Sequence, residues 1–241
     1  MMSFVDMHSH AHRLSQPGRC WPAQLVCCGT QPADWEVVAA WSRQHVGALP
    51  GYGIHPWFVD ACGEDALSVL EQRLRADTSA GVGEIGLHFT KAHPNRVQQR
   101  WYFTAQLQLG VSLGRWISIH CVHAWGALLR SLDEAGCADA RVMVHDFYGR
   151  VEVARALMDR GVYLSLRWRE DRPRLAELVS KLDARFLLVE SDAGGCAVDT
   201  AYDGGILSDT IRRIALCRGE EPEALAEVVY ANSLRVLGLE F

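Results

Sequence analysis

The chain has 241 residues, a formal net charge of −5, and an ordinary balance of 49% hydrophobic and 22% charged residues. This composition argues against intrinsic disorder, and the negative charge excludes a bulk attraction to nucleic acid, so that any polyanion has to meet a local basic patch. No stretch approaches the roughly 20 apolar residues of a membrane span, and the first residues lack a signal-peptide pattern. We therefore expect a cytoplasmic protein that does not insert into membranes.

Short apolar runs alternate with longer amphipathic segments along the chain. The apolar runs predict strands over residues 4–8, 24–29, 47–54, 80–87, 116–121, 140–147, 161–166 and 185–192. The segments between and after them predict helices over residues 34–45, 64–76, 95–110, 124–136, 150–161, 172–182, 207–219 and 221–237. Such alternation indicates parallel strands joined by crossover helices. About eight units in this length favour a single-domain (β/α)8 TIM barrel over residues 1–241, with a doubly wound open sheet as the alternative.

Polar residues at the carboxyl ends of the predicted strands favour the barrel. They lie at the ends of the first, fourth, fifth, sixth and eighth apolar runs: His8, His10, Glu84, His120, His145 and Asp192. A closed barrel gathers the carboxyl ends of its strands at one face, whereas an open sheet spreads them too widely to share one site. Burying these groups without partners would be costly, so we expect them to meet.

The first run ends in DMHSH, which places Asp6, His8 and His10 at alternate positions. In an extended chain these side chains point the same way. Neutral imidazole is the commonest metal ligand in proteins, so His8 and His10 are predicted to bind one cation. Asp6 is predicted to support a ligand from behind. Packed histidines satisfied by hydrogen bonds are the alternative.

The segment GEIGLH supplies Glu84, with Gly83 and Gly86 removing side chains beside it. Glycine is suited to places where backbone and ligands crowd together. A carboxylate has two oxygens and can bridge two cations, so Glu84 is predicted to be the bridge. His120 in IHC and His145 in VHDF are predicted to add one ligand each.

The segment LLVESDAG places two carboxylates at the end of the last predicted strand, Glu190 and Asp192. Asp192 is predicted to be the last metal ligand and the proton acceptor for the attacking water. Glu190 is predicted to support it. The eight cysteines show no comparable pattern, because only Cys27 and Cys28 lie close together, and we expect them all to be reduced.

Weaker signals point to substrate contacts. His55 in GIHPW follows the third predicted strand, and Arg167 and Arg169 in LRWREDRPR follow the seventh. Arginines of this kind can hold backbone phosphates while neighbouring aromatic side chains, such as Trp57 and Tyr148, stack exposed bases. A solvated helix start, partly neutralised by acidic neighbours, is the alternative for the arginines.

The ordered set DMHSH, GIHPW, GEIGLH, IHC, HDFYG and ESDA resembles the TatD family of metal-dependent deoxyribonucleases, which are amidohydrolase-like (β/α)8 barrels. The resemblance covers essentially the whole chain, including ANSLRVLGL with Asn232 and Arg235. It implies that two divalent metal ions bind to His8, His10, Glu84, His120, His145 and Asp192, with Glu84 as the bridge. The ions would be zinc, manganese or magnesium.

The chain departs from the family pattern at several positions. His88 stands where the family usually has Asp, and Val122 stands where it usually has Arg. HDFYG replaces the usual HCFSG, and ESDAG replaces ETDAP. The implied metal ligands survive these changes, so the departures bear on phosphate recognition and substrate choice. His88 is a candidate extra ligand or substrate contact.

The resemblance implies a metal-dependent phosphodiesterase, most simply a DNA exonuclease that acts on single-stranded or frayed DNA ends. Asp192 and Glu84 would be its catalytic residues. One alternative is an amidohydrolase that cleaves C–N or ester bonds, although such barrels often use a modified lysine as the bridge and no lysine adjoins Glu84. Another is a non-catalytic metal-binding barrel that acts as a partner protein.

Overall fold

Eight parallel strands form one sheet that curves into a barrel in the computed structural model, which describes residues 2–14, 22, 24–137, 140–195 and 205–239. Neighbours in the sheet are neighbours in the chain, from β1 to β8. The strands are β1 Val5–Ser9, β2 Gln24–Cys28, β3 Ala48–Tyr52, β4 Gly81–His88, β5 Ile117–Val122, β6 Val142–Val144, β7 Tyr163–Leu166 and β8 Leu187–Val189. This sequential order confirms the predicted (β/α)8 barrel, because a doubly wound sheet reverses its strand order.

Backbone hydrogen bonds join the first strand to the segment that follows the last one. The amide of Asp192 donates to the carbonyl oxygen of His8 at 3.0 Å, and the amide of His10 donates to that of Ala193 at 2.7 Å. These contacts lie at the carboxyl end of β1. The barrel is therefore drawn together at the end where the candidate functional residues lie.

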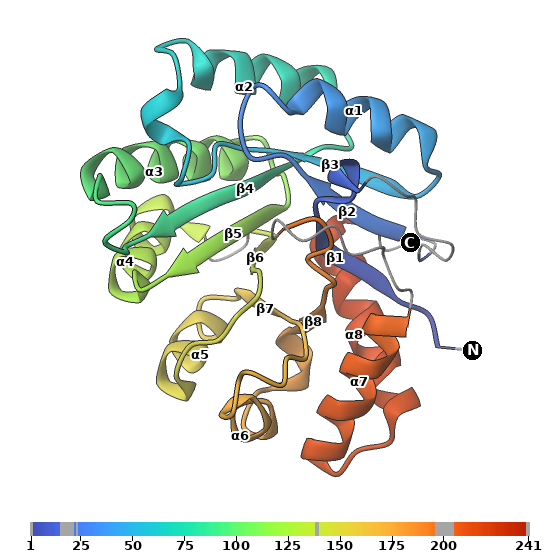
Figure 1. Ribbon diagram of the computed structural model, residues 1–241. Coiled ribbons are helices and arrows are strands. Elements are labelled where there is room, and N and C mark those ends of the chain that lie inside the picture. The colour runs from blue at the N-terminus through green and yellow to red at the C-terminus, as the bar shows by residue number, and fades with distance from the viewer. Residues whose placement is uncertain (1, 15–21, 23, 138–139, 196–204, 240–241) are drawn as a thin grey trace.

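The helices cover the outside of the strands (Figure 1). All eight predicted helices are present: α1 Trp35–Gln44, α2 Ala66–Ala76, α3 Arg96–Ser112, α4 Trp125–Ala135, α5 Val151–Met158, α6 Leu175–Ser180, α7 Gly205–Arg218 and α8 Pro222–Leu237. Short 3-10 turns occupy Ala11–Arg13, Val59–Ala61 and Ala184–Phe186. The last two helices both follow β8, and α8 packs against β8 and β1.

Two strands are shorter than their apolar runs suggest. The sixth run predicts a strand over 140–147, but β6 covers only Val142–Val144, and the eighth run predicts 185–192 where β8 covers Leu187–Val189. Beyond each strand the backbone turns into the left-handed region, with φ of 44° at Asp146 and 50° at Asp192. These two carboxylates therefore lie on turns just beyond the strands.

Side-chain alternation along β5 separates the helix-facing core from the barrel interior. Ile117 and Ile119 are fully buried in the core cluster that the helices share. Ser118 and His120 point the other way, and the hydroxyl of Ser118 contacts the ring of His8 in the interior. A period-two strand thus carries core packing on one face and site residues on the other.

Gly86 allows β4 and β5 to approach closely beside the site. Its φ is +149°, and a Cβ there would lie 1.9 Å from the carbonyl oxygen of His120. Backbone cannot yield as a flexible side chain can, so only glycine fits. This agrees with the crowding that the glycines beside Glu84 predict.

Asn232 on α8 has a packing role. Its side-chain amide donates to the carbonyl oxygens of Ala184 at 2.8 Å and Leu187 at 2.9 Å. Both acceptors lie at the entrance to β8, so the contact fixes the last helix against the last strand. Arg235 lies beside it, with a guanidinium nitrogen 3.4 Å from the Asn232 side-chain oxygen.

The described cysteines are free thiols: Cys27, Cys28, Cys62, Cys121, Cys137 and Cys217. Cys20 and Cys196 lie outside the described residues. Within the described ranges, no helix combines the length and apolar character required to cross a bilayer.

Candidate metal centre

A pocket of about 210 Å³ opens at the carboxyl ends of the strands. Its lining brings together side chains from six strand ends: His10, His55, Glu84, His120, His145 and Asp192. His8 lies directly beneath, fully buried. The six residues predicted as ligands therefore meet around one pocket, together with His55.

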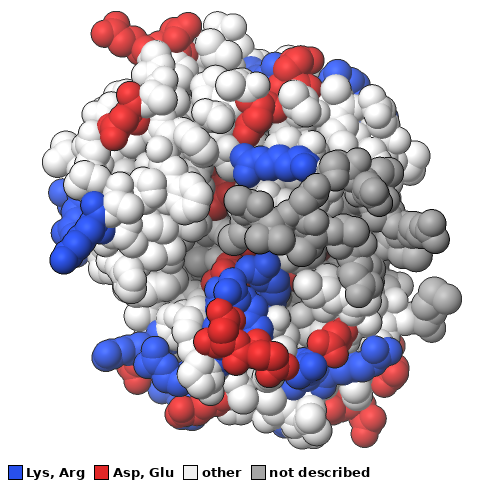
Figure 2. Space-filling view, viewed as in Figure 1, with Lys and Arg blue, Asp and Glu red and all other residues white. Residues whose placement is uncertain are grey.

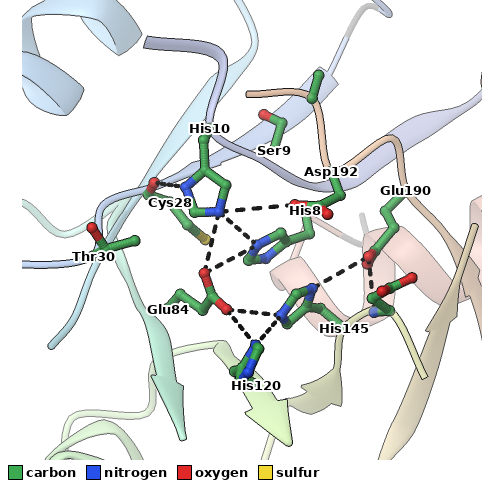
Figure 3. A network of polar contacts seen from close by, with 12 residues as sticks. His8, Ser9, His10, Cys28, Thr30, Glu84, His120, His145, Glu190 and Asp192 are labelled. Carbon is green, nitrogen blue, oxygen red and sulfur yellow. Dashed lines mark hydrogen bonds and ion pairs between the residues drawn. The ribbon is translucent and has the colours of Figure 1, made fainter. Parts of the chain in front are cut away.

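Glu84 lies at the centre of this group and is 3% exposed. Its two carboxylate oxygens face different imidazoles (Figure 3). Oε2 lies 3.2 Å from Nε2 of His10 and 3.6 Å from Nε2 of His8. Oε1 lies 2.8 Å from Nε2 of His145 and 2.9 Å from Nδ1 of His120. Each oxygen thus completes a set of three donor atoms with two ring nitrogens.

The spacing within the first set fits a metal ion. Nε2 of His8 and Nε2 of His10 are 3.4 Å apart, and their distances to Glu84 are 3.6 and 3.2 Å. Ligands at the usual zinc–nitrogen distance in a tetrahedral site are separated by about 3.3 Å. The three donor atoms therefore already stand at the spacing of one face of a coordination tetrahedron.

The second set is slightly tighter. Nδ1 of His120 and Nε2 of His145 are 3.1 Å apart, and His55 approaches the same Glu84 oxygen through Nε2 at 3.3 Å. A carboxylate with imidazole pairs on both oxygens suits two cations better than one, because each oxygen can bind a separate ion. The donor set of nitrogen and carboxylate oxygen fits zinc, manganese or similar divalent ions.

Hydrogen bonds outside the pocket orient the imidazoles of β1. Nδ1 of His10 donates to the carbonyl oxygen of Cys28 at 2.8 Å, which leaves Nε2 as the lone-pair nitrogen that faces Glu84. Nδ1 of His8 lies 2.9 Å from the hydroxyl of Ser118. Both rings are thus held with Nε2 towards the centre, as metal-binding histidines usually are.

His145 and the turn after β6 are held by Glu190. Oε1 of Glu190 lies 3.4 Å from Nδ1 of His145 and accepts a hydrogen bond from the amide of Asp146 at 2.8 Å. The other carboxylate oxygen is buried and forms no hydrogen bond with the described residues. Glu190 therefore supports an imidazole, whereas the sequence predicts that it supports Asp192.

Asp6 supports Asp192 through its neighbour. Its carboxylate accepts hydrogen bonds from the amide of Ser191 at 2.9 Å and from the Ser191 hydroxyl at 2.5 Å. It also lies 3.4 Å from the amide of His8. Among the described contacts, Asp6 therefore binds the backbone of β1 and of the turn after β8, and it contacts no imidazole ring.

Asp192 reaches the centre from the turn after β8. Oδ1 lies 3.9 Å from Nε2 of His10, and ligand atoms of Asp192, His8 and His145 lie within 4.8 Å of one another. Oδ2 forms an ion pair with the guanidinium of Arg167 at 3.2 Å. One oxygen of the carboxylate thus faces the candidate ligands, and the other faces an arginine at the mouth of the pocket.

The pKa shifts follow from burial and from the crowding of charges. Burial alone would raise the pKa of Glu84, but the surrounding imidazoles hold it well below the ordinary value. Burial lowers the pKa of His55 to about 3 and that of His8 well below the usual range. An ionised carboxylate beside neutral imidazoles is the protonation state that metal ligands need.

The pKa values of His145 and Asp192 are raised, whereas those of the groups above are lowered. Burial lowers the pKa of His145, but Glu84 and Glu190 outweigh it and raise the pKa well above the ordinary value. Burial also raises the pKa of Asp192. A cation that binds to His145 has to displace the proton held there, so binding releases protons.

The residues predicted to contact the substrate lie at different positions relative to the pocket. His55 lies against Glu84, closer to the centre than a substrate contact requires. His88 lies behind His120, with its Nδ1 2.9 Å from Nε2 of that ring, and it does not line the pocket. Arg167 and Arg169 both line the pocket, and Arg169 forms an ion pair with Asp171 at 2.7 Å.

Two charged residues at the mouth were not expected as site residues. Asp146 forms a two-pronged ion pair with Arg172, with the Oδ1 contact at 2.8 Å, and it lies 3.8 Å from Nε of Arg167. Arg13 lines the other side and donates to the hydroxyl of Thr30 at 2.6 Å. Two sequence signals could have pointed to them: Asp146 replaces the usual Cys in HDFYG, and Arg13 lies three residues after the DMHSH motif.

Comparison with known proteins identifies the family from the sequence. The family model of TatD-related DNases matches residues 5–238. The 3'-5' ssDNA/RNA exonuclease TatD of Salmonella typhimurium is 30% identical, with 90% of this chain and 88% of that protein covered. The enzyme of the same name from Cronobacter sakazakii is 25% identical, with 95% and 92% covered.

Solved structures show the same fold at lower identity. The TatD homolog YJJV from Escherichia coli k12 superposes with a TM-score of 0.83 at 19% identity, covering 97% of each chain. A TatD family hydrolase from Entamoeba histolytica gives a TM-score of 0.81 at 13% identity, covering 98% of each chain. The sequence match extends over nearly all of the barrel and includes every strand that contributes to the centre. The chain therefore belongs to the family of TatD-related DNases.

Proposed function

We propose that the chain is a metal-dependent exonuclease that hydrolyses phosphodiester bonds at the end of single-stranded DNA or RNA. The observation that carries the proposal is the position of Glu84, whose two oxygens each face a separate pair of imidazoles. The relatives named above are exonucleases of this kind.

The residues divide into two ligand sets in this proposal. His8 and His10 would hold one divalent ion together with Glu84, and His120 and His145 would hold the other together with the same carboxylate. Asp192 adds a ligand, because its carboxylate lies beside His8 and His145. Divalent ions held there would polarise the phosphoryl oxygens and would lower the pKa of a bound water to about 7.

Asp192 accepts the proton of the attacking water in the proposed reaction. Burial raises the pKa of its carboxyl group, which makes the carboxylate a stronger base. Arg167 holds one oxygen of this carboxylate at 3.2 Å and so fixes its orientation. The same guanidinium lines the pocket, where it can also hold a phosphate of the substrate.

The structure offers no specific support for the amidohydrolase alternative. The described residues that line the pocket include no lysine, and Glu84 stands at the bridging position instead. Likeness to dihydroorotase, at 12% identity and a TM-score of 0.66, is likeness of fold alone. The phosphodiesterase is therefore the better assignment.

The test uses purified protein with an end-labelled single strand, a duplex of the same sequence, and amide and lactone substrates, with Mg²⁺, Mn²⁺ or Zn²⁺ in turn. We expect metal-dependent release of nucleotides from the single strand. Glu84→Gln and Asp192→Asn should abolish it, whereas Glu134→Gln, a change on the outer helix α4, should leave it intact. Turnover of an amide with intact nucleic acid would overturn the proposal, and so would metal binding without turnover of any substrate.

A further inference from the structure

A groove of about 330 Å³ lies between α5 and α6, outside the candidate metal centre. Four cationic and two acidic side chains line it: Arg150, Arg155, Arg174, Lys181, Glu152 and Glu177. Figure 2 shows basic side chains, mixed with acidic ones, over the lower half of this face, where α5 and α6 lie in Figure 1. The groove is thus locally positive on a chain whose net charge is −5.

The cations differ in how far they are neutralised. Lys181 forms an ion pair with Glu177 at 2.5 Å on the same helix. Arg150 and Arg155 are exposed, and neither forms an ion pair with the carboxylates of the described residues. Both guanidinium groups are therefore available to an anionic ligand.

Contacts connect the groove to the mouth of the pocket. Arg174 lies at the start of α6, and its guanidinium lies over the ring of Tyr148 at 5.8 Å. Arg172 lies over the same ring at 5.0 Å and binds Asp146, which lines the pocket beside Arg167. Cations and one aromatic ring thus form a continuous series from the candidate metal centre to the groove.

We propose that the groove between α5 and α6 holds the phosphate backbone of a single-stranded nucleic acid whose end lies at the metal centre. Spaced cations that track a backbone, with an aromatic ring beside them, are typical of sites that bind single strands without sequence preference. The inference rests on the proposed function, because it adds contacts to the part of the strand that lies beyond the nucleotide being hydrolysed. It predicts that the enzyme favours long strands over short ones.

A second groove on the same ring of helices provides a matched control. It lies between α3 and α4, has a volume of about 430 Å³, and contains Arg100, Arg130 and the exposed Trp101. None of its lining residues lines the pocket. Charge reversal there changes the net charge by the same amount as reversal in the groove between α5 and α6, but leaves the residues of that groove unchanged.

The experiment compares Arg150→Glu/Arg155→Glu with Arg100→Glu/Arg130→Glu on a dodecanucleotide and a dinucleotide, each as oligothymidylate and as oligouridylate. The groove contacts phosphates, so DNA and RNA should behave alike. The first double variant should raise KM for the dodecanucleotide about tenfold and leave kcat/KM for the dinucleotide unchanged. For this variant, the slope of log KM against log salt concentration should fall by about 0.7 for each lost phosphate contact. The control variant should match the wild type.

Equal losses on both lengths, or equal losses in the control variant, would overturn the proposal. Binding is measured separately by fluorescence anisotropy of a labelled dodecanucleotide with Glu84→Gln protein, in the presence and absence of the groove substitutions. If no nucleotide is released by the wild type, the proposed function fails, while the anisotropy still shows whether the groove binds the strand. Unchanged anisotropy in the groove variant would end the inference even if the nuclease is active.

Discussion

Nδ1 of His88 lies 2.9 Å from Nε2 of His120, so the candidate ligand His120 is supported from behind by an imidazole. Nδ1 of His120 faces Glu84 at 2.9 Å. If Nδ1 supplies the lone pair to a metal ion, Nε2 carries the hydrogen and donates it to His88. Members of the family usually have a carboxylate at this position, which is a stronger acceptor than a neutral imidazole.

His88→Asp is expected to tighten metal binding, because a carboxylate makes His120 a more basic ligand. His88→Leu removes the acceptor and should weaken binding by about 10- to 100-fold. Competition with a chelating dye measures both affinities. His45→Leu is the control, since His45 stacks on Trp41 beside α1 and no described contact joins it to a proposed ligand or to His88. Equal affinities for the Asp and Leu variants would contradict this role of His88.

Divalent ions should stabilise the fold, because their ligands come from strands at opposite ends of the chain. A ligand present at about 100 times its dissociation constant stabilises the native state by about 2.7 kcal/mol. Thermal unfolding with a chelator and with added Zn²⁺ measures the shift. Glu84→Gln should abolish most of the shift, and Glu134→Gln should retain it. An unchanged shift in Glu84→Gln would show that the ions bind elsewhere.

Asp146 should couple energetically to Arg172. The ion pair is largely shielded, with 19% and 13% of the two side chains exposed. Removal of one partner leaves the other charge uncompensated, so Asp146→Ala should destabilise the protein by about 2 kcal/mol. A double-mutant cycle with Arg172→Ala, followed by urea unfolding, should give a coupling of at least about 1 kcal/mol. Additive effects would mean that the contact contributes little.

Gly86→Ala should be far more destabilising than Gly136→Ala. Both glycines have positive φ, but a Cβ at Gly86 would lie 1.9 Å from backbone, whereas one at Gly136 has no neighbour within 4 Å. The strained conformation alone costs about 1 kcal/mol at Gly136. Overlap with the carbonyl of His120 adds to this at Gly86, where we expect a loss above about 3 kcal/mol in urea unfolding. Similar losses at both positions would show that β4 can move away from β5.

The buried thiol of Cys27 should make stability fall at alkaline pH. Burial raises its pKa from 9.0 to about 12. Between these values the unfolded state has lost the proton and the folded state retains it, so stability decreases as pH rises above about 9. Cys27→Ala and Cys27→Ser should each reduce the slope by about 1.4 kcal/mol per pH unit, whatever their stability at neutral pH. Urea unfolding from pH 8 to 11 measures the slope, and an unchanged slope would contradict the assignment.

Much of the barrel and the convergence of its polar strand ends could be predicted from the sequence. Period-two alternation places His8 and His120 inside, and the carboxyl ends of parallel strands meet at one face. The partners of Asp6 and Glu190 could not be predicted. They depend on the turn that follows each strand, where φ is positive at Asp146 and Asp192, and neither residue is a glycine that would mark such a turn. The groove between α5 and α6 depends on helix packing, which no local pattern encodes.

The hydrogen bonds between His8, His10 and the turn after β8 place the candidate centre on the seam of the barrel. Early in synthesis the first strand already carries two imidazoles, but the backbone that completes their surroundings is among the last parts of the barrel to be made. A nascent chain therefore cannot assemble the full site before β8 has docked. Full metal uptake would consequently report that the entire ring of strands has closed.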